Sequence, residues 1–324
     1  MTYWDFKRGM NTVFEGAGIY KDIFLFSTLL DPDGTPSKVN SETVNYPSAL
    51  KRLKSSGFQP WLTIVNDVKS PQGNKAILKD PNLVHQILKE DESRRKHQQK
   101  IIDFAKTYEV TGVDIDYENL FPGDRLPFTR FISELAKDLK KQNLSLSVTV
   151  QPKTGRSSSQ GKGAMDWSQI CRHADRLQIM LYNLHNPKTQ PGPVATLDWI
   201  SSVLKYAKNQ CDPKIIVPVL KVSGMHWSSR KNKAIQYDQA MDLKTRHGVK
   251  LERETVSKVP YFSYRTGTER GTVYFEDAHS LKIKIEHIKS LGFETIVFWS
   301  FGRQDPELTF QLKEFLKPVA KDGL

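Results

Sequence analysis

The sequence predicts an α/β protein of the (β/α)8 TIM barrel class, with a small α+β insertion between the seventh and the eighth strand. Its 324 residues exceed the roughly 250 that one such barrel requires. Short apolar runs alternate with helical patterns along most of the chain, as expected of parallel strands joined by helices. No G-x-G-x-x-G or Walker turn follows the first strand, which disfavours an open nucleotide-binding sheet. We therefore expect residues 1–324 to form a single domain that contains the insertion.

The expected strands are short apolar runs bounded by turn residues, and strands buried on both faces have this composition. They comprise residues 2–6, 22–30, 58–67, 112–120, 144–150, 176–184, 214–222 and 294–301. Apolar residues at helical spacing, with glycines or polar residues at the ends, predict the helices between them. These comprise residues 46–56, 93–108, 127–141, 167–173, 197–208, 280–291 and 307–316.

The insertion is expected over residues 227–277, which do not fit one βα unit. This stretch holds a helical pattern near residues 234–247. Two strand patterns follow, at residues 259–265 and 272–276, and they flank glycines as in a hairpin. The composition therefore predicts a small α+β unit at this point in the chain.

The charge balance is basic, with 48 Lys+Arg against 36 Asp+Glu and a formal net charge of +12. Such a field attracts anionic partners, whether nucleic acid, anionic glycan or acidic surface. No stripe of interleaved basic and aromatic residues supports nucleic-acid binding, so we expect no nucleic-acid partner.

No apolar run approaches the roughly 18 residues of a membrane span, and the N-terminus lacks the regions of a signal peptide. Two cysteines, Cys171 and Cys211, are too few for a disulfide scaffold, and we expect them to be small apolar side chains.

The strongest chemical signal is a strand in which acids alternate with apolar residues. Alternate side chains of a strand share a face, so Asp114, Asp116 and Glu118 point one way. In a central barrel strand the apolar set would meet the helices and the acids would face the interior. Glu118 would then lie at the C-terminal mouth, where barrel enzymes place their active sites. Neighbouring carboxyl groups push their pKa values apart, as acid–base catalysis requires.

Two other interpretations of these acids remain open. The first is an edge strand whose acidic face lies in water, although the mid-chain position and the apolar opposite face argue against it. The second is a divalent-metal site, which no histidine close in sequence supports. We expect no metal and no organic cofactor.

Three motifs in order resemble glycoside hydrolase family 18, the chitinase-like enzymes. Residues 111–118, TGVDIDYE, resemble the family's D-G-x-D-x-D-x-E signature, with Thr111 in place of the first Asp. Residues 180–183, MLYN, resemble its M-x-Y-D/N motif on strand six, and residues 298–302, FWSFG, resemble its tryptophan-bearing strand eight.

A closer resemblance is to the branch of spore-cortex and spore-germination hydrolases. It rests on residues 63–66, 124–125, 151–153, 174–176 and 191–195. Strand seven departs from the relatives, because it has VPVL at residues 217–220 in place of a Pro-x-Tyr-Gly sequence.

The resemblance implies substrate-assisted retaining hydrolysis of a glycan. Glu118 would be the general acid and Asp116 would hold the 2-acetamido N–H. Asp114 would share a proton with Asp116, and Tyr182 would donate a hydrogen bond to the acetamido oxygen. Trp299 would form the apolar floor under the sugar, because pyranose C–H faces pack well on indole. The further expected substrate contacts are Met180, Asn183, Gln151, Asn66 and Tyr3, and Trp4 and Trp227 are candidate subsite walls.

The expected function is cleavage of β-1,4 bonds after N-acetylglucosamine in peptidoglycan or related glycans. Two alternatives are a chitinase and a non-catalytic, lectin-like member of the same fold. The expected partner is the polysaccharide, with the protein a monomer. The sequence shows no signal peptide, so either the protein stays in the cytoplasm or an export segment was removed. We expect action on extracytoplasmic glycan, with the protein secreted or associated with the cell wall. For Tyr182, Trp299, Tyr3 and Met180, ordinary core packing is the alternative role.

Overall fold

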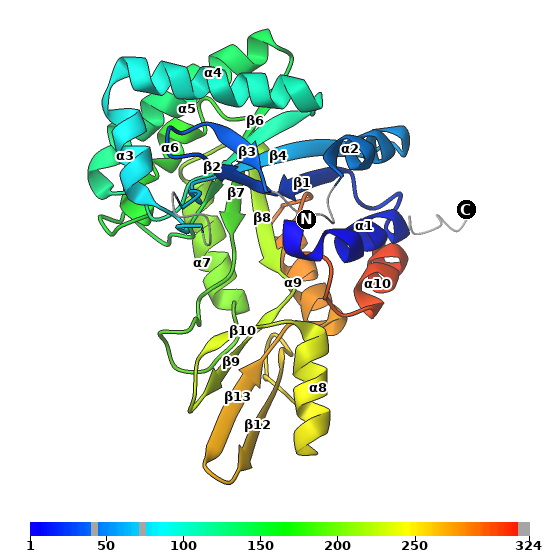
Figure 1. Ribbon diagram of the computed structural model, residues 1–324. Coiled ribbons are helices and arrows are strands. Elements are labelled where there is room, and N and C mark those ends of the chain that lie inside the picture. Colours follow the sequence, from blue (N-terminus) through cyan, green and yellow to red (C-terminus); the bar gives the residue numbers. More distant parts are fainter. Residues whose placement is uncertain (40–44, 71–75, 317–324) are drawn as a thin grey trace, which may run out of the picture.

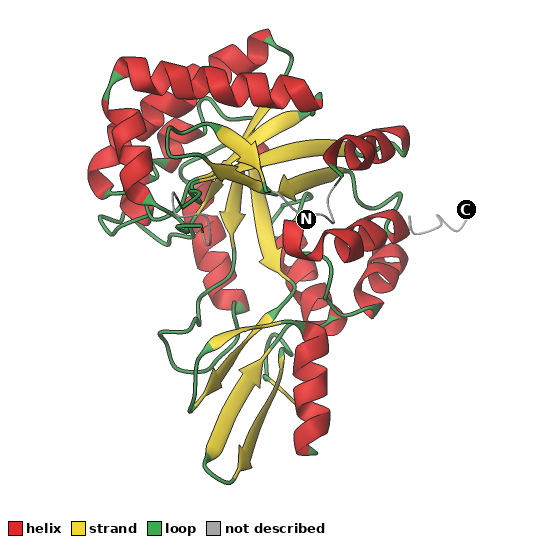
Figure 2. Cartoon of the chain, viewed as in Figure 1, coloured by secondary structure: helices red, strands yellow, loops and turns green. Residues whose placement is uncertain are grey.

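The computed structural model describes residues 1–39, 45–70 and 76–316, and it confirms the predicted α/β barrel class. A curled, all-parallel sheet of seven strands lies at the centre, with helices around it (Figures 1 and 2). In spatial order the strands are β1 (Asp22–Phe26), β4 (Gln59–Val65), β5 (Gly112–Asp116), β6 (Ser145–Val150), β7 (Arg176–Met180), β8 (Ile216–Lys221) and β14 (Val297–Trp299). All carboxyl ends of a parallel sheet lie at one edge, so the segments that follow these strands meet there.

The helices cover the outer face of this sheet (Figure 2). They are α1 (Phe6–Glu15), α2 (Tyr46–Ser55), α3 (Pro81–Lys89), α4 (Asp91–Tyr108), α5 (Arg125–Lys141), α6 (Trp167–Ile170), α7 (Leu197–Lys208), α9 (Ala278–Ser290) and α10 (Glu307–Leu316). Short 3-10 turns are η1 (Tyr3–Asp5), η2 (Pro122–Asp124), η3 (Lys162–Ala164) and η4 (Pro213–Ile215). None of the helices in the described ranges has the length and apolar character needed to cross a bilayer.

The first expected strand, at residues 2–6, was wrong. This stretch forms η1 and then enters α1, and Thr2 makes only an isolated bridge to Phe26. Phe6, Met10 and Val13 are buried at helical spacing, so the apolar pattern continues past residue 6 with a helical period. The expected strand at residues 22–30 divides into β1 and β2 (Thr28–Leu30), which pairs with β3 (Pro36–Lys38).

The main core lies between the sheet and the helices. Val113 and Ile115 of β5 are completely buried in it, as the strand alternation predicts. Tyr117 follows them, and its ring stacks on Phe131 of α5 with centroids 6.0 Å apart. Full burial of each such side chain contributes about 1.5–3 kcal/mol. The apolar face of β5 is therefore held against α5, and its acidic face must point inward.

The segment between β8 and α9 forms a second sheet, at the bottom of Figure 1. Its antiparallel strands are β9 (Gly224–Ser228), β10 (Lys233–Ile235), β11 (Glu252–Arg253), β12 (Pro260–Thr266) and β13 (Glu269–Tyr274), and α8 (Tyr237–His247) packs beside them. A small core of its own includes Ile235, Phe262 and Phe275. The turn between β12 and β13 contains Gly267 with φ of +56°, a conformation that suits glycine.

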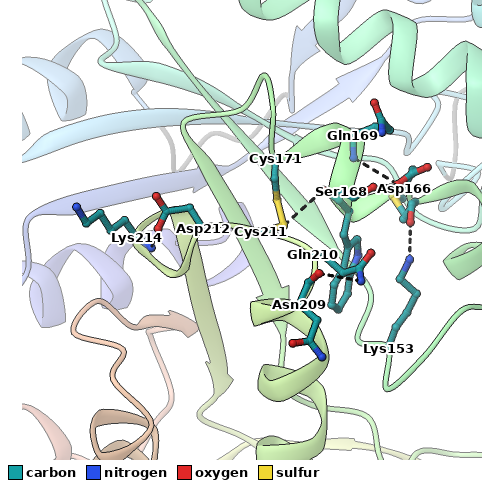
Figure 3. The surroundings of a disulfide bond; sticks show 12 residues. Lys153, Asp166, Ser168, Gln169, Cys171, Asn209, Gln210, Cys211, Asp212 and Lys214 are labelled. Carbon is teal, nitrogen blue, oxygen red and sulfur yellow. Dashed lines mark hydrogen bonds between the residues drawn. A yellow bond between two sulfur atoms is a disulfide. The ribbon is translucent and has the colours of Figure 1, made fainter.

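The two cysteines are joined in a disulfide, so the expectation of two separate apolar side chains was wrong. Cys171 follows α6 and Cys211 follows α7, and their Cα atoms are 5.7 Å apart (Figure 3). The Sγ atom of Cys211 also lies 3.4 Å from the carbonyl oxygen of Trp167. The pair is 40 positions apart in the sequence, and only the packing of the two helical ends brings it together.

We predict that reduction of this disulfide destabilises the protein. For a separation of 40 residues the chain-entropy model gives about 4 kcal/mol. The melting temperature should therefore fall by several degrees in dithiothreitol, as measured by calorimetry. A Cys171→Ser/Cys211→Ser double variant should melt low with or without reductant. Two free thiols titrated in the denatured, unreduced protein would contradict the prediction.

Candidate active site

The candidate site lies on the inner face of the sheet, at the carboxyl end of β5. Asp114 and Asp116 are on this strand and are only 2% and 8% exposed, respectively. Glu118 comes two residues after the strand, and its side chain is 15% exposed. β5 pairs in parallel with β4 on one side and β6 on the other, so neighbouring strands flank the acids. The fold thus places the acids at the mouth of the sheet, as the sequence predicted.

Asp114 is the deepest of the acids, and polar side chains from β6 and β7 hold it. Thr149 Oγ1 lies 3.0 and 3.1 Å from its two carboxyl oxygens. Gln178 Nε2 donates to Asp114 Oδ1 at 3.1 Å and to Ser147 Oγ at 2.9 Å. Burial raises the pKa of Asp114 to about 6, although these hydrogen bonds oppose the rise. Asp114 can therefore hold or release a proton near neutral pH.

Asp116 lies between the other two acids, and one of its oxygens has no partner. Its Oδ1 atom is buried and makes no hydrogen bond. Burial and the charges of Glu118 and Asp114 raise the pKa of Asp116 well above its ordinary value. An unsatisfied buried polar atom costs about 1–3 kcal/mol. A ligand group that hydrogen-bonds to this oxygen would recover that cost.

Glu118 is fixed by its neighbours through both its backbone and its carboxylate. Asn66 accepts from the Glu118 N–H and donates to its carbonyl, both at 2.9 Å. Gln151 Nε2 donates to Glu118 Oε2 at 3.4 Å, and Lys79 forms an ion pair with Oε1. Asn66 is 1% exposed and also donates to the Asp80 carbonyl. Its amide is thus placed to hold the Glu118 backbone, and its contact with a sugar stays a prediction.

Tyr182 and Met180 come from the end of β7 and belong to a small inner cluster. The cluster also contains Val219 and Trp227, with Trp299 packed against it. Burial, together with the charges of Asp116, Glu118 and Asp114, raises the pKa of Tyr182 well above its ordinary value. The phenol therefore stays protonated, as a hydrogen-bond donor beside the acids.

The other residues predicted to contact the substrate are partly exposed or packed near Trp299 and Tyr182. Trp299 is partly buried, and its ring meets Phe26 edge-on with centroids 4.8 Å apart. Trp4 lies 6.5 Å from Trp299 and is 52% exposed, and Tyr3 packs edge-on against Trp4. Asn183 is exposed just beyond Tyr182. Trp227 is only 5% exposed and donates to the Asn186 carbonyl, so it anchors the insertion and offers little open ring surface.

The model of the family described as "Glycosyl hydrolases family 18" matches residues 78–304, which include these acids, Tyr182 and Trp299. The chain belongs to glycosyl hydrolases family 18. The match confirms the family resemblance seen in the sequence.

Relatives of this family-18 chain include the "Cortical fragment-lytic enzyme" of Bacillus subtilis, which is 24% identical over 81% of this chain. The enzyme of the same name from Bacillus anthracis is 26% identical over 70% of this chain. The chain spans 65% and 54% of the length of these two relatives, respectively.

Solved structures of similar fold include the spore cortex-lytic enzyme SleL of Bacillus cereus. It has a TM-score of 0.81 and 24% identity, with 96% of this chain and 70% of that chain covered. A chitinase from Chromobacterium violaceum has a TM-score of 0.82 and 20% identity, with 95% of both chains covered. These likenesses confirm the fold class.

The sequence reasoning missed two lysines in this family-18 site. Lys79 lies in the loop between β4 and α3 and is half exposed. Burial acts to lower the pKa of Lys79, but the carboxylates of Glu118, Asp116 and Asp67 outweigh it, and the pKa is raised. Lys221 ends β8, and burial lowers its pKa to about 8. Strand alternation along β8 would have placed Lys221 on the inner face, whereas nothing local to Lys79 signals its contact with Glu118.

In residues 1–39, 45–70 and 76–316, no group of three or more His, Cys, Asp or Glu side chains has an arrangement that could hold a metal ion. The functional groups of the site are carboxyl groups, a phenol, amides and two amines.

We predict that the effect of Asp114→Asn on the free energy of unfolding is more favourable at neutral pH than at acid pH. The folded-state pKa of Asp114 is raised, so its contribution to stability is fully present below pH 3.8 and is lost as pH rises through about 6. Asparagine does not titrate, so the variant does not undergo this loss. The unfolding free energy of the variant minus that of the wild type should therefore rise by about 2–3 kcal/mol between pH 4 and pH 7.5. Urea unfolding at the two pH values measures it. The exposed Asp242→Asn in α8 is the control, and equal effects of Asp114→Asn at both pH values would contradict the prediction.

Proposed function

We propose that this family-18 protein hydrolyses β-1,4 linkages after N-acetylglucosamine in peptidoglycan or related glycans, by substrate-assisted retaining catalysis. The observation that supports it most is the unpartnered, buried Oδ1 of Asp116, flanked by Asp114 and Glu118 and beside the protonated phenol of Tyr182. A sugar with a 2-acetamido group carries both an N–H donor and a carbonyl acceptor, and the site offers the complement of each.

In the proposed first step the acetamido oxygen attacks the anomeric carbon while the bond to the leaving oxygen breaks. Glu118 gives its proton to that oxygen, and the substrate becomes an oxazolinium ion. Asp116 accepts a hydrogen bond from the acetamido N–H and offsets the positive charge. Tyr182 donates to the acetamido oxygen and aims it. In the second step Glu118 takes a proton from water, which attacks the same carbon and restores the β configuration.

Proton sharing among the acids is central to this scheme. Three carboxylates in one enclosed space repel one another strongly, so at least one must be protonated. Asp114 is suited to hold the shared proton, because burial raises its pKa to about 6. When Asp116 gains negative character beside the oxazolinium ion, Asp114 can take the proton from it. Thr149 and Gln178 keep Asp114 in place during this exchange.

The choice of peptidoglycan rests on three further observations. Two of the relatives are named as cortical fragment-lytic enzymes. The Cys171–Cys211 disulfide suits an oxidising compartment, which agrees with action on an extracytoplasmic glycan. The net charge of +12 favours an anionic polymer through long-range attraction that salt screens. We propose a monomer as the working form.

We predict that Glu118→Gln abolishes turnover while the fold survives. Loss of general acid–base catalysis costs about 10²–10⁴-fold in rate. New reducing ends from glycan strands and from a chitin hexamer should be counted side by side, and mass spectrometry should identify the products. The matched control is Glu109→Gln, whose side chain is 83% exposed in the turn before β5. Unchanged turnover in Glu118→Gln would reject the proposal, and binding without turnover in the wild type would favour the lectin-like alternative.

We predict that Tyr182→Phe lowers kcat by about 10²-fold, because the phenol donor acts where charge develops. KM should change much less, since the ring and its packing remain. Tyr206→Phe, on α7 at the outer shell, serves as the control. A kcat equal to that of the wild type would assign Tyr182 to core packing alone.

A further inference from the structure

Lys221 lies on the inner face of β8, at the strand's carboxyl end. Alternate residues of a strand share a face, so Lys221 points to the same side as Val219. Val219 packs in the inner cluster with Met180 and Tyr182, which fixes that side as the inside of the sheet. The Nζ atom of Lys221 lies 5.9 Å from the centroid of the Tyr182 ring. Its register partner on β14 is Trp299, the predicted sugar floor.

This amine has no acidic partner among the described residues. Its Nζ atom instead faces the Tyr182 ring. Lys79, the other lysine of the site, is paired with Glu118. A cation that has lost much of its water and gained no anion is unfavourable, and burial lowers the pKa of Lys221 to about 8 accordingly. A carboxylate from a ligand would supply the missing charge.

The two sides of the site differ in charge. On β5 the acids Asp114, Asp116 and Glu118 would repel an anion, and Lys79 is already neutralised by Glu118. Lys221 is separated from β5 by β6 and β7 in the sheet order. An anionic substituent on the substrate would therefore be directed toward β8, while the acetamido group faces β5.

Resting on the proposed function, we propose that Lys221 determines specificity by binding the lactyl carboxylate of N-acetylmuramic acid in the glycan strand. The lactyl ether is attached directly to the ring of the muramyl sugar next to the N-acetylglucosamine held at Tyr182, so its carboxylate can reach a side chain on the inner face of β8. Carboxylates of a stem peptide lie several residues farther out. The lactyl carboxylate is free only where the peptide has been removed, and chitin has no such group. The preferred substrate is then peptide-free muramyl glycan.

The test compares three substrates that differ at this one group. They are peptide-free strands with the lactyl carboxylate, the same strands with that carboxylate reduced to an alcohol, and a chitin hexamer. The wild type should show a kcat/KM at least tenfold higher for the carboxylate strand than for the reduced strand. Lys221→Met should lower the kcat/KM on the carboxylate strand to that on the reduced strand and so abolish this difference. Lys221→Arg should retain the preference, and the exposed Lys214→Met, just before β8, should behave as the wild type.

A binding measurement separates this inference from the proposed function. Calorimetric titration of a Glu118→Gln/Lys79→Gln double variant, in which no Lys79 cation is left without its partner, should give a Kd at least tenfold lower for the carboxylate strand than for the reduced strand. The added Lys221→Met should make the two Kd values equal. If the wild type cleaves none of the substrates but the Kd values differ in this way, the proposed function fails and the carboxylate site stands. Equal Kd values for the two strands, or a uniform loss with Lys221→Met on all three substrates, would overturn the inference.

Discussion

The site depends on the enclosure of several carboxyl groups on one face of a strand whose other face is fully apolar. Val113 and Ile115 are buried against the helical shell, and this packing leaves β5 one orientation only. Rotating the strand would bury its acids among Phe128 and Phe131 of α5 and expose the apolar set. The free energy gained by burying the apolar outer face thus offsets the electrostatic cost of enclosing the acids on the inner face.

Each of the three acids has its own surroundings on the inner face. Asp114 is hydrogen-bonded and deep, Asp116 has an unsatisfied oxygen, and Glu118 is near the mouth with Lys79 and Gln151 on its carboxylate. Because the environments differ, burial raises the pKa of Asp114 and, together with the neighbouring acids, that of Asp116, whereas Glu118 stays close to the mouth. The three carboxyl groups can therefore take different roles, because they lie at different depths in the barrel and have different neighbouring side chains.

Elements outside β5 supply the other side chains of the site. The inner cluster ties β7, β8 and β14 to the insertion through Trp227 and Tyr274. The disulfide links the ends of α6 and α7, the helices before β7 and β8 (Figure 3). Lys221 places an amine on the β8 side of the site, opposite the acids of the β5 side. A polymer that carries acetamido groups and carboxylates would find a complement for each on opposite walls.

The sequence by itself determined the features that depend on local periodicity. Alternation along residues 112–118 decided which side chains share a face, and the run of strands and helices decided the barrel class, because both follow from backbone geometry. The tertiary structure alone decided the contacts between distant segments. It joined Cys171 to Cys211, turned Asn66 toward the Glu118 backbone and brought Lys79 to the Glu118 carboxylate. No local pattern encodes these pairs, since each distance is set by how helices and loops pack around the sheet.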